Sequence, residues 1–201
     1  MKILKFKDEQ EWLDARRGKI TGSKLKDIVI QKGKKEKVGF YELIADRLGL
    51  PPGDENAMER GHELEPEAIE RFEESTGKKV NTDLVIWEHA KYPNIALSPD
   101  GFIGKTEAVE VKCLSSARHI QAVIENEVPA EYKYQVIQYF IVNEKLKTLY
   151  FVFYDPRLKI KDFHVITINR TSLQDEIEEI TLYQIAKLEK INAIVAELTQ
   201  F

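Results

Sequence analysis

Residues 98–113 read SPDGFIGKTEAVEVKC, and this stretch decides the expected fold. Its two apolar runs are separated by Gly104-Lys105, which is typical of a strand hairpin. In a strand, residues two apart share a face, so Glu110 and Lys112 should point to the same side. The hairpin should also bring Asp100, which comes just before the first strand, beside Glu110.

Asp100, Glu110 and Lys112 together suggest a metal-dependent reaction. Two carboxylates that converge on one point repel each other unless a cation lies between them. Oxygen-only ligation of that kind suits Mg²⁺ or Mn²⁺. A lysine beside the cation can hold or deprotonate an attacking water and neutralise charge on a phosphoryl oxygen. An exposed strand with a cross-strand salt bridge explains the same three residues, so both interpretations stay open.

A third acid is expected on the helix that the sequence predicts over residues 56–75. At about 100° per residue, Glu65 lies in the centre of an apolar stripe. The stripe is formed by Met58, Gly61, Ala68, Ile69 and Phe72. A lone carboxylate on a buried stripe is costly unless it is paired. It either bridges to an arginine in the core or belongs to a metal or active site.

An amide is expected on the helix predicted over residues 130–143, which Pro129 should open. This helix is apolar nearly all round and is therefore expected to be buried. Gln135 shares a face with Tyr132 and Tyr139. A buried amide needs partners for its donor and acceptor atoms, which water, a metal ligand or the backbone can supply.

The rest of the chain predicts an α/β fold. Short runs separated by turn residues between positions 84 and 113 predict a meander of strands, and two more strands are expected at 148–154 and 163–168. Further helices are expected at 9–17, 21–30, 40–48, 117–126 and from residue 172 onward. A central mixed sheet flanked by helices is the simplest architecture.

Composition narrows the class of protein. The chain is 43% hydrophobic and 32% charged, as in a soluble globular protein. Its single cysteine excludes an intramolecular disulfide, a four-cysteine zinc site and a cysteine-ligated iron–sulfur cluster. The apolar runs are too short to span a bilayer, and the first residues lack the apolar core of a secretory signal. We therefore expect a cytoplasmic protein without a membrane anchor.

The net charge of −4 argues against a general nucleic-acid binder, but the charge is uneven. Residues 1–50 carry 13 lysines and arginines against 8 acids, whereas residues 51–100 carry 5 against 12. This pattern suits a polyanion-binding arm beside a carboxylate-rich metal site. Ordinary solvated faces give the same pattern.

Several stretches form a joint pattern that runs in order from residue 12 to about residue 170. They are Trp12 to Arg16 with Ile20-Thr21-Gly22-Ser23, Gly61 to Glu65 with Ala68, residues 98–101 with 110–113, Tyr132 with Gln135, and Tyr154-Asp155-Pro156-Arg157. Taken together, they resemble the phage lambda-type exonuclease family, the viral recombinase branch of the PD-(D/E)xK nucleases. One departure is Leu114, which follows Cys113 where family members commonly have proline.

The resemblance implies a restriction-endonuclease-like core, with a central mixed β-sheet flanked by helices. Residues 1–201 would form a single nuclease domain. Within it, residues 1–50 would be a helical DNA-end-binding segment, 56–170 the catalytic core and 172–201 a C-terminal helix.

The resemblance also implies roles for the acidic cluster. Asp100, Glu110 and the backbone carbonyl of Val111 would hold one or two Mg²⁺ ions, with Mn²⁺ as a substitute. Glu65 would complete this acidic site. Lys112 would activate the nucleophilic water, and Gln135 would orient water or substrate.

A second group of residues would bind DNA. Arg16, Ser23 and Ser98 would form a pocket for a 5′-terminal phosphate, which suits a forked guanidinium and hydroxyl donors. A surface charge at a helix end is the alternative for Arg16. The duplex backbone would be contacted by a lysine cluster, namely Lys32, Lys34, Lys35 and Lys37.

The function that the resemblance implies is Mg²⁺-dependent 5′→3′ degradation of one strand of linear duplex DNA. Mononucleotides would be released, leaving a 3′ single-stranded tail for recombination. A homotrimer, a phage single-strand annealing protein as partner and a phage or prophage origin are also implied. A site- or structure-specific endonuclease on the same core is the alternative enzyme. A catalytically inactive DNA-binding or scaffold protein is the alternative class.

Overall fold

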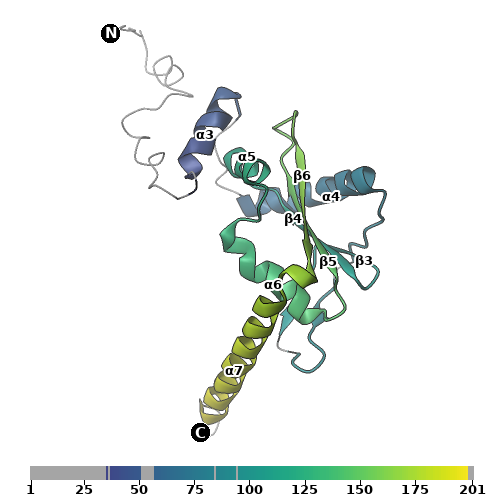
Figure 1. The fold of residues 1–201 in the computed structure, drawn as a ribbon, viewed down its shortest axis with the longest axis vertical. Helices are drawn as coiled ribbons and strands as arrows, with labels where there is room; N and C mark the ends of the chain where they lie inside the picture. Colours follow the sequence, from purple (N-terminus) through teal and green to yellow (C-terminus); the bar gives the residue numbers. More distant parts are fainter. Residues whose placement is uncertain (1–34, 36, 51–56, 84, 94, 199–201) are drawn as a thin grey trace, which may run out of the picture. The chain divides into compact units, whose positions relative to one another are not determined.

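A computed structural model describes residues 35, 37–50, 57–83, 85–93 and 95–198 (Figure 1). Contacts group the chain into two compact units. The first comprises the described part of residues 1–64 with Cys113–Asn126 and Phe153–His164; the second comprises Glu65–Lys112, Glu127–Val152 and the described part of residues 165–201. The helices expected at 9–17 and 21–30 lie outside the described residues, and the expected three-part division of one domain stays a prediction.

The elements follow the order that the sequence predicts. The helices are α3 (Val38–Arg47), α4 (Ala57–Thr76), α5 (Ser116–Glu125), α6 (Lys133–Val142) and α7 (Gln174–Leu198), with short 3₁₀ helices η1 (Ala130–Tyr132) and η2 (Arg170–Ser172). The strands are β1 (Trp87–Glu88), β2 (Ala96–Leu97), β3 (Gly101–Ile103), β4 (Glu107–Lys112), β5 (Thr148–Tyr154) and β6 (Phe163–Asn169). A strand is expected in the run that begins at residue 84. The strand observed there, β1, begins only at Trp87. Among the described helices, none is both long and apolar enough to cross a bilayer.

Four strands form a mixed sheet in the order β3-β4-β5-β6, and β1 pairs with β2 separately. β3 and β4 are antiparallel. The Thr106 carbonyl accepts hydrogen bonds from the backbone N–H groups of Lys147 and Thr148, so β4 and β5 start side by side and run in the same direction. The Arg170 N–H donates to the Lys147 carbonyl, which places the end of β6 beside the start of β5. The expected mixed sheet is confirmed.

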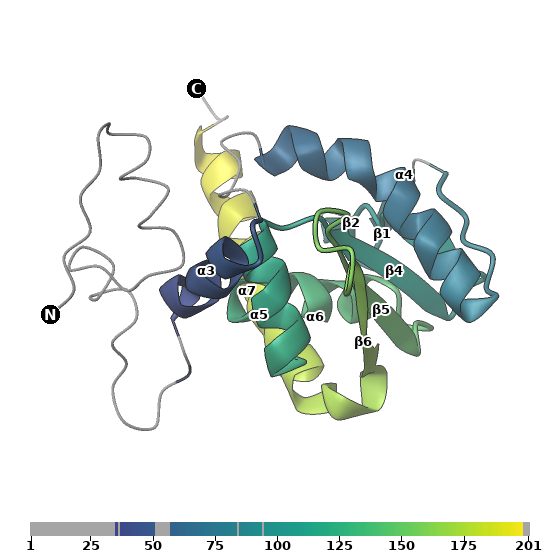
Figure 2. The ribbon, with the colours of Figure 1, turned by 90° about the horizontal axis from the view of Figure 1, so that it is seen from above.

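In the second unit, helices cover both faces of the sheet. Neighbouring residues of β5 point to opposite faces. The Tyr150 ring lies 5.2 Å from that of Phe72 on α4, and the Phe151 ring lies 5.7 Å from that of Tyr132 on η1. Figure 2 shows α4 on one side of the strands and α6 on the other. The site residues of α6 therefore face the sheet from the side opposite α4.

The β3–β4 hairpin fixes the position of Asp100. Gly101 pairs with Val109, which places Asp100 next to Glu110 across the hairpin. A Cβ at Gly101 would lie 2.4 Å from Cγ1 of Val80, so this close approach requires glycine. The turn itself contains Gly104 at a φ of +60°, a left-handed conformation that glycine adopts without strain. The expected hairpin is confirmed.

Arg170 holds the C-terminal end of α6 in place. Its Nε donates to the Leu146 carbonyl at 2.8 Å, and its Nη2 donates to the carbonyls of Phe140 and Asn143. The last carbonyls of a helix have no partner within the helix, and a cation there also interacts favourably with the helix dipole. Arg170 thus anchors α6 to the end of β6.

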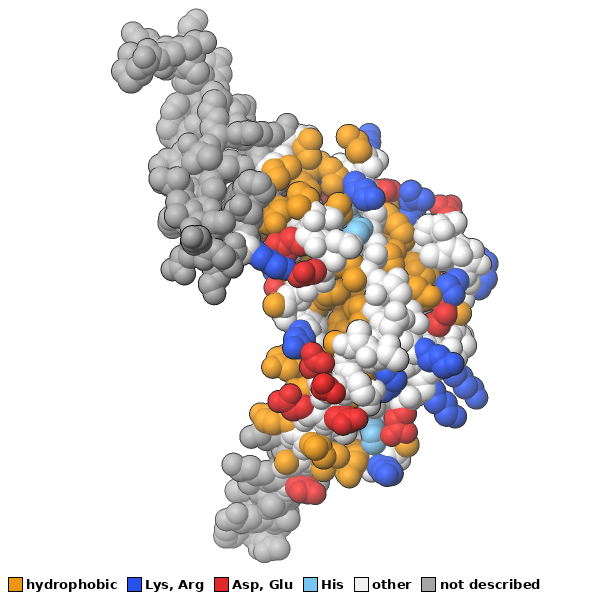
Figure 3. All heavy atoms as spheres, viewed as in Figure 1, with side chains coloured by type: hydrophobic (Ala, Val, Ile, Leu, Met, Phe, Trp, Pro, Cys, Tyr) orange, Lys and Arg blue, Asp and Glu red, His pale blue; other side chains and the backbone are white. Residues whose placement is uncertain are grey.

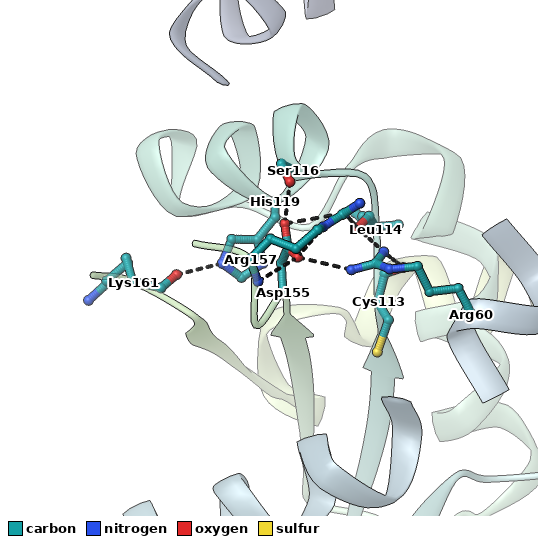
Figure 4. A network of polar contacts seen from close by, with 8 residues as sticks. All are labelled: Arg60, Cys113, Leu114, Ser116, His119, Asp155, Arg157 and Lys161. Carbon is teal, nitrogen blue, oxygen red and sulfur yellow. Dashed lines mark hydrogen bonds and ion pairs between the residues drawn. The ribbon is translucent and has the colours of Figure 1, made fainter. Parts of the chain in front are cut away.

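In the first unit, a buried carboxylate binds the residues that follow β4 (Figure 4). Asp155 is fully buried and accepts hydrogen bonds from Arg60 Nη2 at 2.9 Å, Arg157 Nε at 2.7 Å and Ser116 Oγ at 2.6 Å. Both arginines also donate to the Leu114 carbonyl, at 2.9 and 3.3 Å. The chain therefore leaves β4 along a segment fixed by two guanidinium groups, and this segment contains Leu114.

Burial alone would raise the pKa of Asp155, but the hydrogen bonds from Arg157 and Ser116, together with the charge of Arg157, outweigh burial and hold the pKa below its ordinary value. A lowered carboxyl pKa stabilises the fold above the unfolded-state pKa of about 3.9. This stabilisation is lost as the pH falls through the lower pKa of the folded state.

We expect Asp155→Asn to lower the free energy of unfolding by about 3 kcal/mol at pH 7, because it leaves two partly buried guanidinium groups without their buried counter-charge. The loss should shrink below about pH 4, where the wild-type carboxyl is itself protonated in the unfolded state. Urea denaturation at pH 7 and below pH 4 measures this loss of unfolding free energy. Glu70→Gln, which changes an exposed acid on α4, is the matched control. A loss of equal size at both pH values would contradict the assigned role of the charge.

Candidate functional site

Glu110 is the centre of the site. Only 1% of its surface is exposed, and its side chain lies on the face of β4 that α6 covers. Its Oε1 accepts hydrogen bonds from Lys112 Nζ and from Gln135 Nε2, each at 2.5 Å, and its Oε2 accepts one from the Tyr139 hydroxyl at 2.5 Å. A buried charge needs such donors, and the cationic one contributes most. Both oxygens of Glu110 are thereby fixed in orientation.

Lys112 supplies that cationic donor. It lies on the same face of β4 as Glu110, as the alternation of the strand predicts. Its Nζ also lies 5.1 Å from the centre of the Tyr132 ring, within the range of a cation–π interaction. Burial alone would lower the pKa of Lys112, but the charge and hydrogen bond of Glu110, together with the charge of Asp100, outweigh burial and raise the pKa above its ordinary value. Without a metal ion, Lys112 is therefore an ammonium group.

Asp100 is the second carboxylate at this point. Its Oδ2 accepts a hydrogen bond from the Val111 N–H at 2.8 Å, which fixes it against β4. Burial, followed by the negative charge of Glu110, raises the pKa of Asp100 to about 7. Within the part of the chain that the structure describes, no lysine or arginine forms an ion pair with Asp100 as Lys112 does with Glu110, although the charge of Lys112 lowers the pKa of Asp100 slightly.

Glu65 contributes from α4, where Ala68, Ile69 and Phe72 form a buried stripe as predicted. The negative charge of Glu65 also raises the pKa of Asp100, so the two carboxylates act on each other electrostatically. Glu65 is partly buried. The structure thus places three acids in one electrostatic group.

The donor set suits a hard divalent cation. Among the described residues, no three histidine, cysteine, aspartate or glutamate side chains lie close enough to form a complete metal-binding group. Mg²⁺ is usually held by one or two carboxylates and keeps several waters. Asp100 and Glu110 provide that number, and the raised pKa of Asp100 shows where positive charge is lacking. The residues present therefore fit a magnesium-like ion with few protein ligands.

The face predicted for Gln135 is confirmed, because Gln135 and Tyr139 both donate to Glu110. The function of Tyr139 as a donor was missed. Tyr139 follows Gln135 by one helical turn on the same face, and this spacing could have indicated that both residues contact the same partner. The expectation that this helix is buried is confirmed for the apolar residues at 136, 137 and 140–142, but it is wrong at Tyr134, which is 67% exposed. Residues of one helix cannot all face the sheet, and Tyr134 lies on the side that the sheet does not cover.

The expected 5′-phosphate pocket is described only in part. Arg16 and Ser23 lie outside the described residues, and Ser98 is exposed just before Asp100. Of the expected DNA-backbone lysines, Lys32 and Lys34 also lie outside, whereas Lys35 and Lys37 are exposed. The roles of these residues stay predictions.

Exposed basic side chains also lie on the second unit. Lys105 is exposed in the β3–β4 turn, and Lys145 and Lys147 are exposed just before β5. On the face seen in Figure 3, lysine and arginine side chains gather near β3. The basic surface is therefore not restricted to the lysines that the sequence singled out.

Comparison with known proteins gives consistent findings. Residues 11–146 match the profile of the YqaJ-like viral recombinase domain. The uncharacterized protein YqaJ of Bacillus subtilis (strain 168) is 30% identical over 145 residues, which cover 70% of this chain and 44% of that protein. This chain therefore spans less than half the length of that curated relative.

Solved structures match more of the chain. The alkaline exonuclease LHK-Exo from Laribacter hongkongensis is 30% identical, with a TM-score of 0.59, over 94% of this chain and 100% of that one. Its complex with dAMP matches with 31% identity over the same shares, also with a TM-score of 0.59. A phage-related exonuclease from Haemophilus somnus 129PT matches over 88% of this chain and 94% of that one, with a TM-score of 0.50 and 17% identity, which shows the fold alone.

We expect Asp100→Asn to stabilise the metal-free protein. With a pKa near 7, the ionised carboxylate of Asp100 opposes folding, and this penalty grows as the pH rises from about 4, the unfolded-state value, to 7. The variant should raise the free energy of unfolding by about 2 kcal/mol at pH 8, and by nearly nothing at pH 4.

Urea denaturation in EDTA at both pH values measures this effect. Asp83→Asn, which changes an exposed aspartate, is the control. An Asp100→Asn protein no more stable than wild type at pH 8 would show that this carboxylate is not under electrostatic strain.

Proposed function

Because the chain belongs to the YqaJ-like viral recombinase family, we propose that it is a metal-dependent exonuclease acting on the ends of linear duplex DNA. The similarity to an alkaline exonuclease along that protein's whole length supports this activity. The observation that carries the proposal is that Asp100, which directly precedes β3, lies next to Glu110 on β4, with Lys112 hydrogen-bonded to Glu110. A structural ion pair needs one carboxylate and one ammonium group, and the second carboxylate is unexplained without a cation.

Asp100, Glu110 and the Val111 carbonyl would hold Mg²⁺, or Mn²⁺ in its place, as one or two ions. Glu65 would add negative charge from α4. When bound, the cation supplies Lewis-acid stabilisation of the negative charge that develops on the phosphoryl group.

The residues of the chain then do the positioning. Gln135 and Tyr139 each donate to Glu110 and thereby fix the direction of its oxygens. The ammonium group of Lys112 carries three N–H donors, and Glu110 accepts a hydrogen bond from one of them. The other donors can orient a water for attack on phosphorus, in line with the leaving 3′-oxygen, and can bind a phosphoryl oxygen. The attacking water gives up its proton to solvent, and the leaving 3′-oxygen takes a proton from solvent.

Further parts of the proposal concern polarity and assembly. Recognition of a 5′-terminal phosphate by Arg16, Ser23 and Ser98 would direct degradation 5′→3′. The products would be mononucleotides and a 3′ single-stranded tail. We also propose that the protein forms a homotrimer and is cytoplasmic. Its partner would be a phage single-strand annealing protein that loads on the 3′ tail.

We expect Lys112→Ala to lower the rate of Mg²⁺-dependent hydrolysis of linear duplex DNA at least about 100-fold, the usual effect of losing a donor to developing charge. Duplex binding in EDTA should change little, because Lys112 is one cation among many. Lys159→Ala, which removes an exposed lysine of the first unit, is the control. Cleavage by Lys112→Ala at the wild-type rate would exclude the role of Lys112.

Digestion of end-labelled duplex, 5′-phosphorylated or not, followed by product size over time, separates an exonuclease from an endonuclease. An exonuclease releases labelled mononucleotides from the first time point, and Arg16→Ala should abolish its preference for phosphorylated ends. Internal fragments and indifference to Arg16→Ala would instead indicate a site- or structure-specific endonuclease. Absence of Mg²⁺-dependent products would indicate a DNA-binding or scaffold protein.

A further inference from the structure

A cleft between α6 and α7 adjoins the candidate active site. The two helices lie side by side in the second unit (Figure 1). The cleft has a volume of about 810 Å³. Its lining includes Tyr134, Gln135 and Gln138 from α6 and Glu179, Tyr183 and Gln184 from α7. This volume lies within the range of small-ligand sites, which is about 300–1,000 Å³.

Gln135 connects this cleft to the acids. Its side chain lines the cleft, and its Nε2 also donates to Glu110 at 2.5 Å. The cleft therefore begins one side chain away from the carboxylate that we assign to the reaction. A DNA strand with a phosphodiester at Glu110 has neighbouring nucleotides within reach of the α6–α7 cleft.

The cleft walls suit nucleobases better than phosphates. Tyr134 on α6 and Tyr183 on α7 both line the cleft and are 67% and 58% exposed. The described lining includes no lysine or arginine, and the carboxylate of Glu179 would repel a phosphate. Bases stack on exposed aromatic rings with little regard to sequence, at about 1–3 kcal/mol per base.

The amides add polar groups of the kind that base edges bind. Gln184 Nε2 donates to Gln138 Oε1 at 2.6 Å, and Gln138 Nε2 donates to the Ala96 carbonyl at 3.3 Å. These bonds tie α7 to α6, and α6 to β2. Each amide has two N–H donors and an oxygen with two lone pairs, so one bond leaves it with further capacity.

We propose that the α6–α7 cleft binds unpaired nucleobases of the DNA strand next to the bond that is cut, by stacking on Tyr134 and Tyr183. This inference rests on the proposed function, because it takes the strand at Glu110 to be DNA. It assigns to the cleft a single-stranded ligand, because a base can stack on a side-chain ring only when that face is not stacked within a duplex. A partner polypeptide or a second copy of this chain is the competing occupant.

The test is binding of single-stranded oligothymidine by the full chain in EDTA, where no hydrolysis occurs. Tyr134→Leu and Tyr183→Leu keep an apolar side chain but remove the ring, and each should weaken binding about tenfold. Tyr183→Phe should bind as wild type does, because the ring stays. Leu182→Ala is the matched control: Leu182 is 70% exposed on α7 and does not line the cleft. Circular dichroism checks that each variant is folded.

An abasic strand of the same length separates base stacking from phosphate binding. Wild type should bind it about tenfold or more weakly than oligothymidine, and the leucine variants should bind it as wild type does. The proposal is overturned if wild type does not bind oligothymidine, if the leucine variants bind it as tightly as wild type does, or if they weaken abasic binding equally. A change in sedimentation of the leucine variants, with unchanged DNA binding, would assign the cleft to a second copy of the chain.

Failure of this inference is distinguishable from failure of the proposed function. Binding is measured without a metal ion, whereas the proposed function is tested by Mg²⁺-dependent cleavage and by Lys112→Ala. If the protein cuts DNA but binds single strands equally well without the two tyrosines, only the proposed role of the α6–α7 cleft is overturned. If the protein binds single strands through the tyrosines but cuts no DNA, only the proposed nuclease activity is overturned.

Discussion

The carboxylate of Glu110 is buried among three hydrogen-bond donors, and the geometry of the site depends on it. An ionised group with 1% exposure would be very costly without those donors. Lys112 comes from the same strand, whereas Gln135 and Tyr139 come from α6, so the requirement to satisfy one charge ties α6 to the sheet. The hairpin register then brings a second acid, Asp100, next to this satisfied one. The result is a position with excess negative charge, which a divalent cation would neutralise.

Local patterns predicted the parts of this arrangement that depend on neighbouring residues. Strand alternation placed Glu110 and Lys112 on one face, turn residues placed Asp100 across a hairpin, and helical periodicity placed Glu65 among buried apolar residues. Each inference needs only the geometry of one element or one turn. The mixed sheet was predictable for a similar reason, because strand runs alternate with helical ones along the chain.

Other features depend on contacts between segments far apart in the sequence, which no local pattern contains. Asp155 was visible only as part of a turn motif, yet its partners Arg60 and Ser116 lie 95 and 39 residues away. The exposure of Tyr134 was missed because an apolar helix gives no sign of which side the sheet covers. The α6–α7 cleft likewise arises where two helices meet, and the family pattern names only Gln135 among its lining residues.

The central claim is that Asp100 and Glu110 share a divalent cation. The most direct measurement is an anomalous difference map from crystals of the protein grown with Mn²⁺, recorded at the manganese absorption edge. Our account predicts a peak within coordination distance of both carboxylates and of the Val111 carbonyl. A peak elsewhere in the protein, with Lys112 still bonded to Glu110 and no density between the two acids, would contradict it.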